Sequence, residues 1–296
     1  MDGSSGSSGD DPSTAGDDSP IGCGSDRPIV ADLHVHTTAS DGSLTVSEIP
    51  AAAERAGLEW VAVTDHDRIH PDLSEPVVER DGISIIRGIE LRVDAGEMRV
   101  DLLGYGVSET DALAEEIDRI QRDRIDRGRR IIDRVESRLD VRLDVEAAPG
   151  IGRPHIARAI ADSPAPHDYG DAFAELIGAD CPCYVSREVT PLERGVDLLS
   201  ESCALVALAH PFRYDDVDAA LELASGLDAI ERWYPYDVEV DPGRIDRFRA
   251  RSDVDLLATG GTDAHERTLG VAGLTRSAFE PVRRTIVDPG KPREQS

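Results

Sequence analysis

The fold is decided by residues 28–42, which read Pro28-Ile-Val-Ala-Asp-Leu-His-Val-His-Thr-Thr-Ala-Ser-Asp-Gly42. The first six residues are mostly apolar, which predicts a short buried strand. Histidines follow at positions 34 and 36, and side chains two residues apart on an extended chain point the same way. His34 and His36 are therefore predicted to face one common point at the end of this strand.

The later sequence repeats this pattern of strand and helix. Further strands are predicted at residues 59–64, 83–91, 98–105, 204–209, 228–232 and 255–259, and helices at residues 45–56, 192–202, 217–224 and 243–251. Such alternation is typical of parallel strands joined by crossover helices, so we predict the α/β class. The alternation stops between residues 111 and 190, where one long charged helix and two shorter ones predict a helical insertion.

These patterns divide the chain into five segments. Residues 1–26 are rich in Gly, Ser and Asp and are expected to form a disordered tail. Residues 27–110 and 191–275 are expected to form the two parts of a barrel, residues 111–190 an inserted helical subdomain, and residues 276–296 a C-terminal tail.

The charge balance is strongly acidic. Asp and Glu number 59 against 32 Lys and Arg, the formal net charge is −27, and the only lysine is Lys291. This composition is typical of a protein kept soluble by concentrated salt, which screens self-repulsion, so a halophilic cytoplasm is the expected setting. The charge argues against stable binding of duplex nucleic acid. Neither a membrane span nor a secretory signal is predicted.

Five of the eight histidines fall within a few residues of a predicted strand end. They are His34, His36, His66, His210 and His265. The carboxylates Asp41 and Asp263 lie in the same short segments as some of these histidines, and Glu90 ends the third predicted strand in Gly88-Ile-Glu90. Strand ends of a parallel barrel converge at one rim, and imidazoles with carboxylates there predict a site for Mn²⁺, Zn²⁺ or Fe²⁺. For any one of these residues the alternative is a structural role without a metal. For His155, the sequence pattern alone does not decide between a ligand and a structural role.

Seven short strings occur in an order that resembles the motifs of the polymerase and histidinol phosphatase (PHP) family. They are Asp32-Leu-His-Val-His36, Ser40-Asp-Gly42, Thr64-Asp-His-Asp67, Gly88-Ile-Glu90, Gly152-Arg-Pro-His155, Ala209-His-Pro211 and Thr262-Asp-Ala-His265. The likeness spans roughly residues 28–270 and is greatest to TrpH-like members, phosphoesterases that act on nucleotides and short RNA ends. At Ala264 relatives often have an aromatic residue, which leaves the pocket shape there open.

The resemblance implies a distorted seven-stranded, TIM-like barrel with an inserted helical subdomain. It also implies a centre of two or three divalent metal ions, Mn²⁺, Zn²⁺ or Fe²⁺. The ligand set that it implies is His34, His36, Asp41, His66, Glu90, His155, His210, Asp263 and His265.

The predicted reaction is hydrolysis of a phosphate monoester by a metal-activated hydroxide. The resemblance points to a nucleotide, such as a 3′,5′-bisphosphate, or the 5′ end of a short RNA or oligonucleotide as the substrate. Arg153, Arg158 and Arg213 flank ligand motifs, and guanidinium groups suit phosphate oxygens, although a surface ion pair is the alternative for each. Asp65, Arg153 and Arg213 are the predicted catalytic residues, and Asp65 and Asp67 are expected to orient the ring of residue 66.

Three other functions remain open on the sequence. The first is a histidinol-phosphatase-like enzyme, which would also be a phosphoesterase. The second is a metal-binding regulatory module, which would bind metal without catalysing a reaction. An amidohydrolase-like enzyme that cleaves C–N bonds is disfavoured, because such sites commonly use a carboxylated lysine and Lys291 is in the C-terminal tail. The sequence does not predict the oligomeric state.

Overall fold

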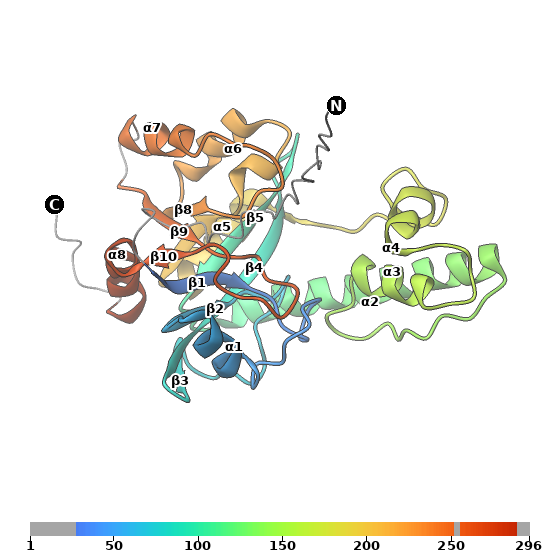
Figure 1. Ribbon diagram of the computed structural model, residues 1–296. Coiled ribbons are helices and arrows are strands. Elements are labelled where there is room, and N and C mark those ends of the chain that lie inside the picture. The colour runs from blue at the N-terminus through green and yellow to red at the C-terminus, as the bar shows by residue number, and fades with distance from the viewer. Residues whose placement is uncertain (1–27, 252–254, 289–296) are drawn as a thin grey trace, which may run out of the picture.

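The computed structural model describes residues 28–251 and 255–288 (Figure 1). Within these ranges one sheet follows the strand order β10-β1-β2-β4-β5-β7-β8-β9, and β3 and β6 each pair with β4. The strands are β1 (Ile29–Val35), β2 (Trp60–Val63), β3 (Val77–Arg80), β4 (Ile83–Asp94), β5 (Arg99–Tyr105), β6 (Thr190–Pro191), β7 (Leu205–Leu208), β8 (Ala229–Trp233), β9 (Leu257–Gly260) and β10 (Leu274–Thr275). The expected tail at residues 1–26 lies outside the described residues.

The segment after β9 returns to β1 and closes the sheet into a distorted barrel. Ala264 N donates a hydrogen bond to His34 O at 3.1 Å, and His36 N donates to Ala264 O at 3.0 Å. A Cβ atom added at Gly261 would lie 2.3 Å from His34 N, so only glycine allows this approach. The α/β barrel class is confirmed, with more strands than the expected seven.

The sheet is not wholly parallel. Strand β5 runs antiparallel to both of its neighbours, β4 and β7. The connection between β4 and β5 is residues 95–98, which is too short for a crossover helix and folds as a hairpin with Gly96 at φ +87°. Strand β4 also continues to Asp94, so Glu90 lies inside a strand and not at its end as expected.

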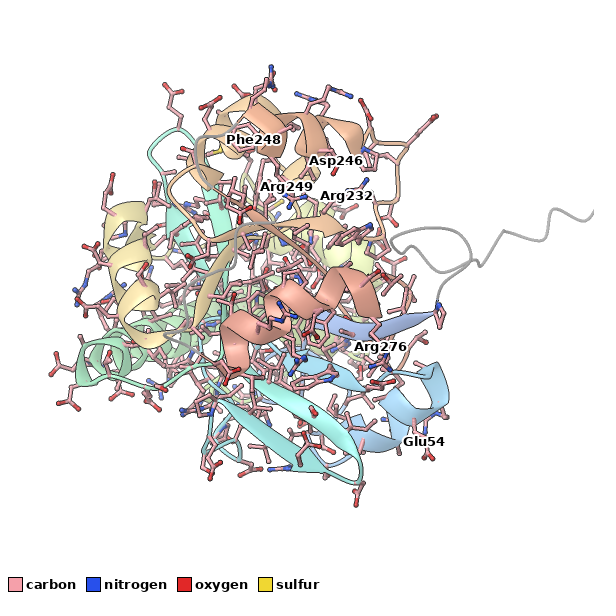
Figure 2. The ribbon with its side chains drawn as sticks, turned by 90° about the vertical axis from the view of Figure 1, so that its left-hand side faces the viewer. Glu54, Arg232, Asp246, Phe248, Arg249 and Arg276 are labelled. Carbon is pink, nitrogen blue, oxygen red and sulfur yellow. The ribbon has the colours of Figure 1, made fainter. Side chains whose placement is uncertain are left out.

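Helices cover the outside of the barrel. They are α1 (Ile49–Ala56), α5 (Leu192–Ser202), α6 (Val217–Ala224), α7 (Gly243–Arg251) and α8 (Arg276–Val287), with the 3₁₀ turn η2 at Pro211–Arg213. The expected C-terminal tail from residue 276 is therefore a helix as far as Val287. Figure 2 shows α8 lying across the barrel, where Phe279, Val282 and Ile286 are buried in one apolar cluster with Leu33. Arg232 on β8 binds Asp246 on α7 with an Nε–Oδ1 distance of 2.7 Å.

The predicted helical insertion projects to one side of the barrel (Figure 1). It contains α2 (Asp111–Leu139), α3 (Arg153–Ala161), α4 (Tyr169–Asp171) and the π-helical turn η1 (Ala172–Ile177). These elements bury an apolar cluster of their own, which includes Ile131, Val135, Ile156 and Leu176. The expected long helix is confirmed as α2. Among the described helices none has both the length and the apolar character that crossing a bilayer requires.

Candidate metal centre

The two histidines of the first motif lie side by side at the end of β1. Leu33 and Val35 are buried in apolar clusters, so the alternating residues His34 and His36 turn to the other face of the strand. Both imidazoles are fully buried, and their ring centroids are 5.1 Å apart. The extended backbone thus brings the two imidazoles together, as predicted.

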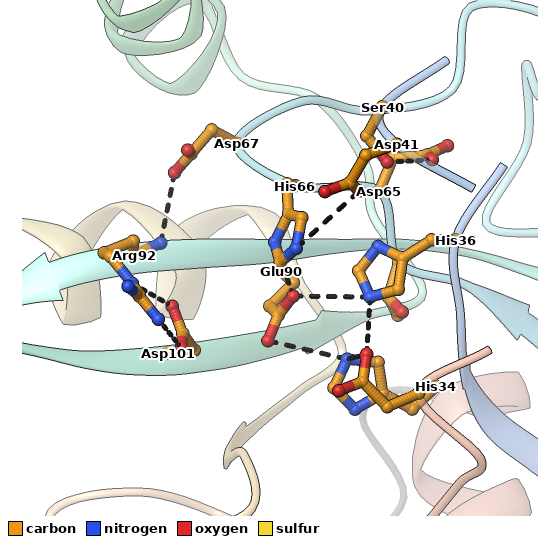
Figure 3. A network of polar contacts seen from close by, with 12 residues as sticks. His34, His36, Ser40, Asp41, Asp65, His66, Asp67, Glu90, Arg92 and Asp101 are labelled. Atoms are coloured by element: carbon orange, nitrogen blue, oxygen red, sulfur yellow. Dashed lines mark hydrogen bonds and ion pairs between the residues drawn. The ribbon is translucent and has the colours of Figure 1, made fainter. Parts of the chain in front are cut away.

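Glu90 on β4 lies at the centre of the histidine cluster (Figure 3). Its Oε2 atom is 2.6 Å from His66 Nδ1 and 3.4 Å from His36 Nε2. Its Oε1 atom is 3.1 Å from His210 Nε2 and 3.5 Å from His34 Nε2. Burial alone would raise the pKa of Glu90, but His66 and His34 hold it well below its usual value, so the carboxylate is the favoured form.

A second carboxylate, Asp41, gathers histidines from two distant loops. Its Oδ1 atom is 3.5 Å from His265 Nε2 and 3.8 Å from His66 Nε2. The ring of His36 is 4.3 Å from that of His265, centroid to centroid, so this group adjoins the one around Glu90. Burial opposes ionisation of Asp41, but His66 and His265 lower its pKa below the usual range.

Asp263 joins the cluster from the segment that closes the barrel. Its Oδ1 atom is 3.0 Å from His36 Nε2 and 3.4 Å from His34 Nε2, and Arg213 and Tyr234 bind its Oδ2 atom at 3.1 and 2.9 Å. Asp263 has φ +53°, and His210 has φ +26°. Left-handed backbone is strained for such residues and persists where the surroundings enforce it.

The spacing of these atoms fits divalent cations. Ligand atoms at about 2.1 Å from one ion are roughly 3.0 to 3.5 Å from each other, close to the separations at Glu90, Asp41 and Asp263. His34 Nε2 and Asp41 Oδ1 are buried and take part in no hydrogen bond within the described part of the protein. Buried ionised carboxylates facing unsatisfied nitrogens are costly without a cation, so the residues present fit metal ions.

Asp101 is a candidate ligand that the sequence analysis missed. This buried residue of β5 forms a group with Glu90 and His210 in which the ligand atoms all lie within 4.8 Å of one another. Both oxygens of Asp101 also bind the guanidinium group of Arg92, with a distance of 2.7 Å from Nε to Oδ1. The only sequence signal was an acidic residue among the apolar residues of this strand.

Glu231 on β8 is a second residue that the sequence analysis missed. Its Oε1 atom is 3.1 Å from His34 Nδ1, and its Oε2 atom accepts a hydrogen bond from His210 N at 2.7 Å. Carboxylates in this position fix the tautomer of a ligand histidine and turn its other nitrogen toward the metal. Glu231 therefore positions His34 and the backbone of His210.

Glu231→Gln is expected to weaken metal binding by about 10- to 100-fold, because the amide holds the His34 ring less firmly and no longer raises its basicity. Competition with a chromogenic chelator measures the affinity. Glu222→Gln on the exposed side of α6 is the matched control and should leave the affinity as it is. An unchanged affinity in Glu231→Gln would remove the positioning role.

Two predicted roles beside His66 are wrong. Asp65 does not orient the ring: its oxygens accept hydrogen bonds from Thr37 and Ser40 at 2.6 to 2.8 Å, which holds the loop that carries Asp41. Asp67 is turned away by its backbone, which has φ +53°. Its oxygens bind the backbone N–H of residue 92 and the guanidinium groups of residues 124 and 187.

His155 is placed differently from the other predicted ligands. Its Nδ1 atom accepts a hydrogen bond from Gly152 N at 3.1 Å, and the candidate metal groups among the described residues do not include it. Burial lowers the pKa of His155, and the nearby carboxylate of Asp41 opposes that effect, so His155 lies beside the centre. One of the two ring nitrogens of His155 is therefore engaged in a local hydrogen bond in the turn before α3. A sequence motif does not show such a contact.

The three predicted phosphate-binding arginines have different surroundings. Arg213 binds Asp263 at the edge of the site. Arg153 lies over the rings of Phe173 and Tyr184 in the insertion. Arg158 forms a half-exposed ion pair with a glutamate at position 266, which is the alternative considered for it. A groove of about 920 Å³ opens beside the centre, and its lining includes Arg92, Asp101, His210 and Arg213.

Comparison with known proteins agrees with this geometry. The model of the PHP domain matches residues 32–161. The phosphoribosyl 1,2-cyclic phosphate 1,2-diphosphodiesterase of Eggerthella lenta is 31% identical over 251 residues, which cover 80% of this chain and 94% of that protein. The 3′,5′-nucleoside bisphosphate phosphatase of Chromobacterium violaceum is 30% identical, covering 79% and 86%.

The fold is also found in a solved structure from Bifidobacterium adolescentis, with a TM-score of 0.70, 23% identity and coverage of 88% of this chain and 97% of that one. This protein is a metal-dependent phosphoesterase, as its barrel fold, its carboxylate–histidine cluster and its similarity to these enzymes together indicate. The chain belongs to the PHP domain family.

Proposed function

We propose that this protein hydrolyses phosphate monoesters of nucleotides, with nucleoside 3′,5′-bisphosphates as the first choice and the 5′ ends of short RNA or oligonucleotides as the second. The observation that carries the proposal is the position of Glu90, whose two oxygens contact four imidazoles from three segments of the chain. The 30% identical Chromobacterium violaceum phosphatase supports the choice of substrate.

We propose three groups of residues to hold two or three divalent ions, Mn²⁺, Zn²⁺ or Fe²⁺. One is His34, His36, Glu90 and Asp263; the second is Glu90, Asp101 and His210; the third is Asp41, His66 and His265, with His155 beside it. Ions bound there would supply Lewis-acid activation of water and neutralise charge on the phosphate.

The chain itself supplies the positioning of the ester. Asp263 Oδ2 and the hydroxyl of Tyr234 hold the Nη1 atom of Arg213 at 3.1 and 3.0 Å, so this guanidinium is fixed at the edge of the centre, where it can bind phosphate oxygens. The adjoining groove gives the rest of a nucleotide room to lie. Arg213 is therefore the proposed catalytic arginine.

Metal removal tests the proposed function. Protein supplied with Mn²⁺ in concentrated KCl, which suits its net charge of −27, is expected to release inorganic phosphate from adenosine 3′,5′-bisphosphate. EDTA should reduce the rate at least ~100-fold, and Mn²⁺ in excess should restore it, since the ions supply most of the activation. A phosphate assay follows the reaction.

Other substrates in the same assay separate the alternatives. A 5′-phosphorylated trinucleotide, a cyclic phosphate diester and histidinol phosphate test the remaining phosphoesters, and amide substrates test C–N hydrolysis. Metal retained without hydrolysis of any of these compounds would overturn the proposal in favour of a binding module. We further propose that the enzyme works in a salt-rich cytoplasm, so its activity is expected to rise with KCl concentration.

A further inference from the structure

Asp32 on β1 is a buried carboxylate that the candidate metal groups do not include. Its side chain is fully buried, and in the described part of the chain its partners are hydrogen-bond donors and no cationic side chain. A buried carboxylate is costly unless its surroundings stabilise the charge. The position of Asp32 therefore requires an explanation beyond packing.

Each oxygen of Asp32 accepts two hydrogen bonds. Oδ1 accepts from the backbone N–H of Thr262 at 2.9 Å and from that of His34 at 3.3 Å. Oδ2 accepts from the hydroxyl of Thr262 at 2.5 Å and from the backbone N–H of Gly270 at 2.9 Å. Only a carboxylate accepts at both ends, because an asparagine of the same shape would turn an NH₂ group toward one pair of donors.

Three of these four hydrogen bonds come from the segment that closes the barrel. We call residues 261–273, which lie between the end of β9 and the start of β10, the closing segment. Asp32 joins Thr262 to Gly270, and Thr262 Oγ1 also accepts from the N–H of Val271 at 3.0 Å. Asp32 thus attaches both ends of the loop of residues 263–269 to β1.

This loop carries two of the proposed metal ligands. Asp263 directly follows Thr262, and its Oδ1 atom is 3.0 Å from His36 Nε2. His265 Nε2 is 3.5 Å from Asp41 Oδ1. The carbonyl oxygen of Asp263 is 3.0 Å from His265 Nδ1, so displacement of one of these residues would move the other.

The backbone of Asp263 needs support on both sides. Its φ of +53° lies in the left-handed region, which is unfavourable for a residue with a side chain and persists where neighbouring contacts fix it. The hydrogen bonds of Thr262 to Asp32 fix the preceding residue. The hydrogen bond from Ala264 N to His34 O fixes the following one. Loss of the first support would let the backbone relax and withdraw the carboxylate of Asp263 from the centre.

We propose that Asp32 is a positioning residue, which holds the closing segment so that Asp263 and His265 stay at the metal centre. It acts through Thr262 and Gly270, the two residues that it attaches to β1. The inference rests on the proposed metal positions and adds to them a residue that controls where two of the ligands lie.

The role of Asp32 predicts an uneven effect on the metal positions. The group with Asp263 and the group with His265 both take a ligand from the closing segment. The group of Glu90, Asp101 and His210 takes none. Loosening of the closing segment should therefore weaken binding at the first two positions and leave the third as it is.

Thr262→Val tests this role, because it keeps the shape of the side chain and removes the hydroxyl that binds Asp32. Metal-free protein is titrated with Mn²⁺, and free Mn²⁺ is measured by electron paramagnetic resonance. Binding at the positions that use the closing segment is expected to weaken about tenfold or more. Asp32→Asn should have the same effect. Thr262→Ser keeps the hydroxyl and should restore binding, and Thr268→Val, at an exposed position of the same segment, is the matched control.

Three results would overturn the proposal. The first is unchanged Mn²⁺ binding in both Thr262→Val and Asp32→Asn. The second is an equal loss at every metal position, because Asp32 would then act on the centre as a whole. The third is a lower unfolding temperature in EDTA with normal Mn²⁺ binding, because the hydrogen bonds of Asp32 would then stabilise the barrel without positioning any ligand.

Hydrogen exchange on EDTA-treated protein distinguishes this proposal from the proposed function. In Thr262→Val and Asp32→Asn the amides of residues 262–270 are expected to exchange about tenfold or more faster than in Thr268→Val. Faster exchange confined to this loop would support the role of Asp32 even if the enzyme hydrolysed no phosphate ester. Phosphate release from adenosine 3′,5′-bisphosphate, with exchange unaffected by the variants, would support the proposed function and overturn the role of Asp32.

Discussion

Glu90→Gln is expected to abolish metal binding and hydrolysis together. Because the Glu90 carboxylate contacts His34, His36, His66 and His210, loss of its charge weakens all the proposed metal positions at once. A decrease in kcat/KM of about 10³-fold or more is expected, which corresponds to about 4 kcal/mol of transition-state stabilisation. Phosphate release and the metal content of the purified protein are the two measurements.

The glutamine keeps the size of the side chain, so the fold should persist. Glu54→Gln, on the exposed side of α1, is the matched control and should keep full metal content and activity. A Glu90→Gln protein with normal metal content and undiminished turnover would show that the cluster is not the catalytic centre. A protein that fails to fold in the presence of EDTA would instead assign Glu90 a structural role.

Asp263→Ala is expected to reduce kcat by about 10³-fold or more while leaving the fold intact. The change removes a carboxylate that contacts His34 and His36, and it also releases Arg213 from its fixed position. Burial raises the pKa of Asp263, but the two histidines keep it well below the usual range, so an anion is lost from the centre. Single-turnover phosphate release measures the effect.

The fold is compared by thermal unfolding in EDTA, where differences in metal content do not contribute. Asp133→Ala, an exposed position of α2, is the control for loss of an acidic side chain and should behave like the unaltered protein. Turnover close to normal in Asp263→Ala would exclude Asp263 from the centre. Asp263→Ala is expected to reduce kcat more than KM, because its contacts lie at the reacting end of the substrate.

Much of the candidate centre could be predicted from the sequence because its residues lie in short local patterns. His34 and His36 share a face through the two-residue repeat of a strand, and His66 and His265 each follow a strand that reaches the same rim. Such patterns depend on the neighbours of a residue in the chain. The helix α2 was predictable for the same reason, since its apolar positions recur with helical spacing.

Asp101 and Glu231 could not be found in this way. Each is the one acidic residue of a mostly apolar strand. Nothing near it in the sequence distinguishes a metal ligand or a positioning residue from a residue at an exposed edge. Asp101 reaches Glu90 and His210 because β5 turns back as an antiparallel strand between β4 and β7. The predicted orientation of His66 by Asp65 failed because Asp65 has closer donors in Thr37 and Ser40, which belong to a different strand end.

By itself the sequence determined that this chain is an α/β barrel with a helical insertion and that histidines and carboxylates meet at strand ends, because periodicity and chain order express local backbone geometry. Only the tertiary structure decided which carboxylates lie beside which imidazoles and that β5 is antiparallel. Those contacts depend on the closure of the barrel, which brings together side chains that are distant in the chain.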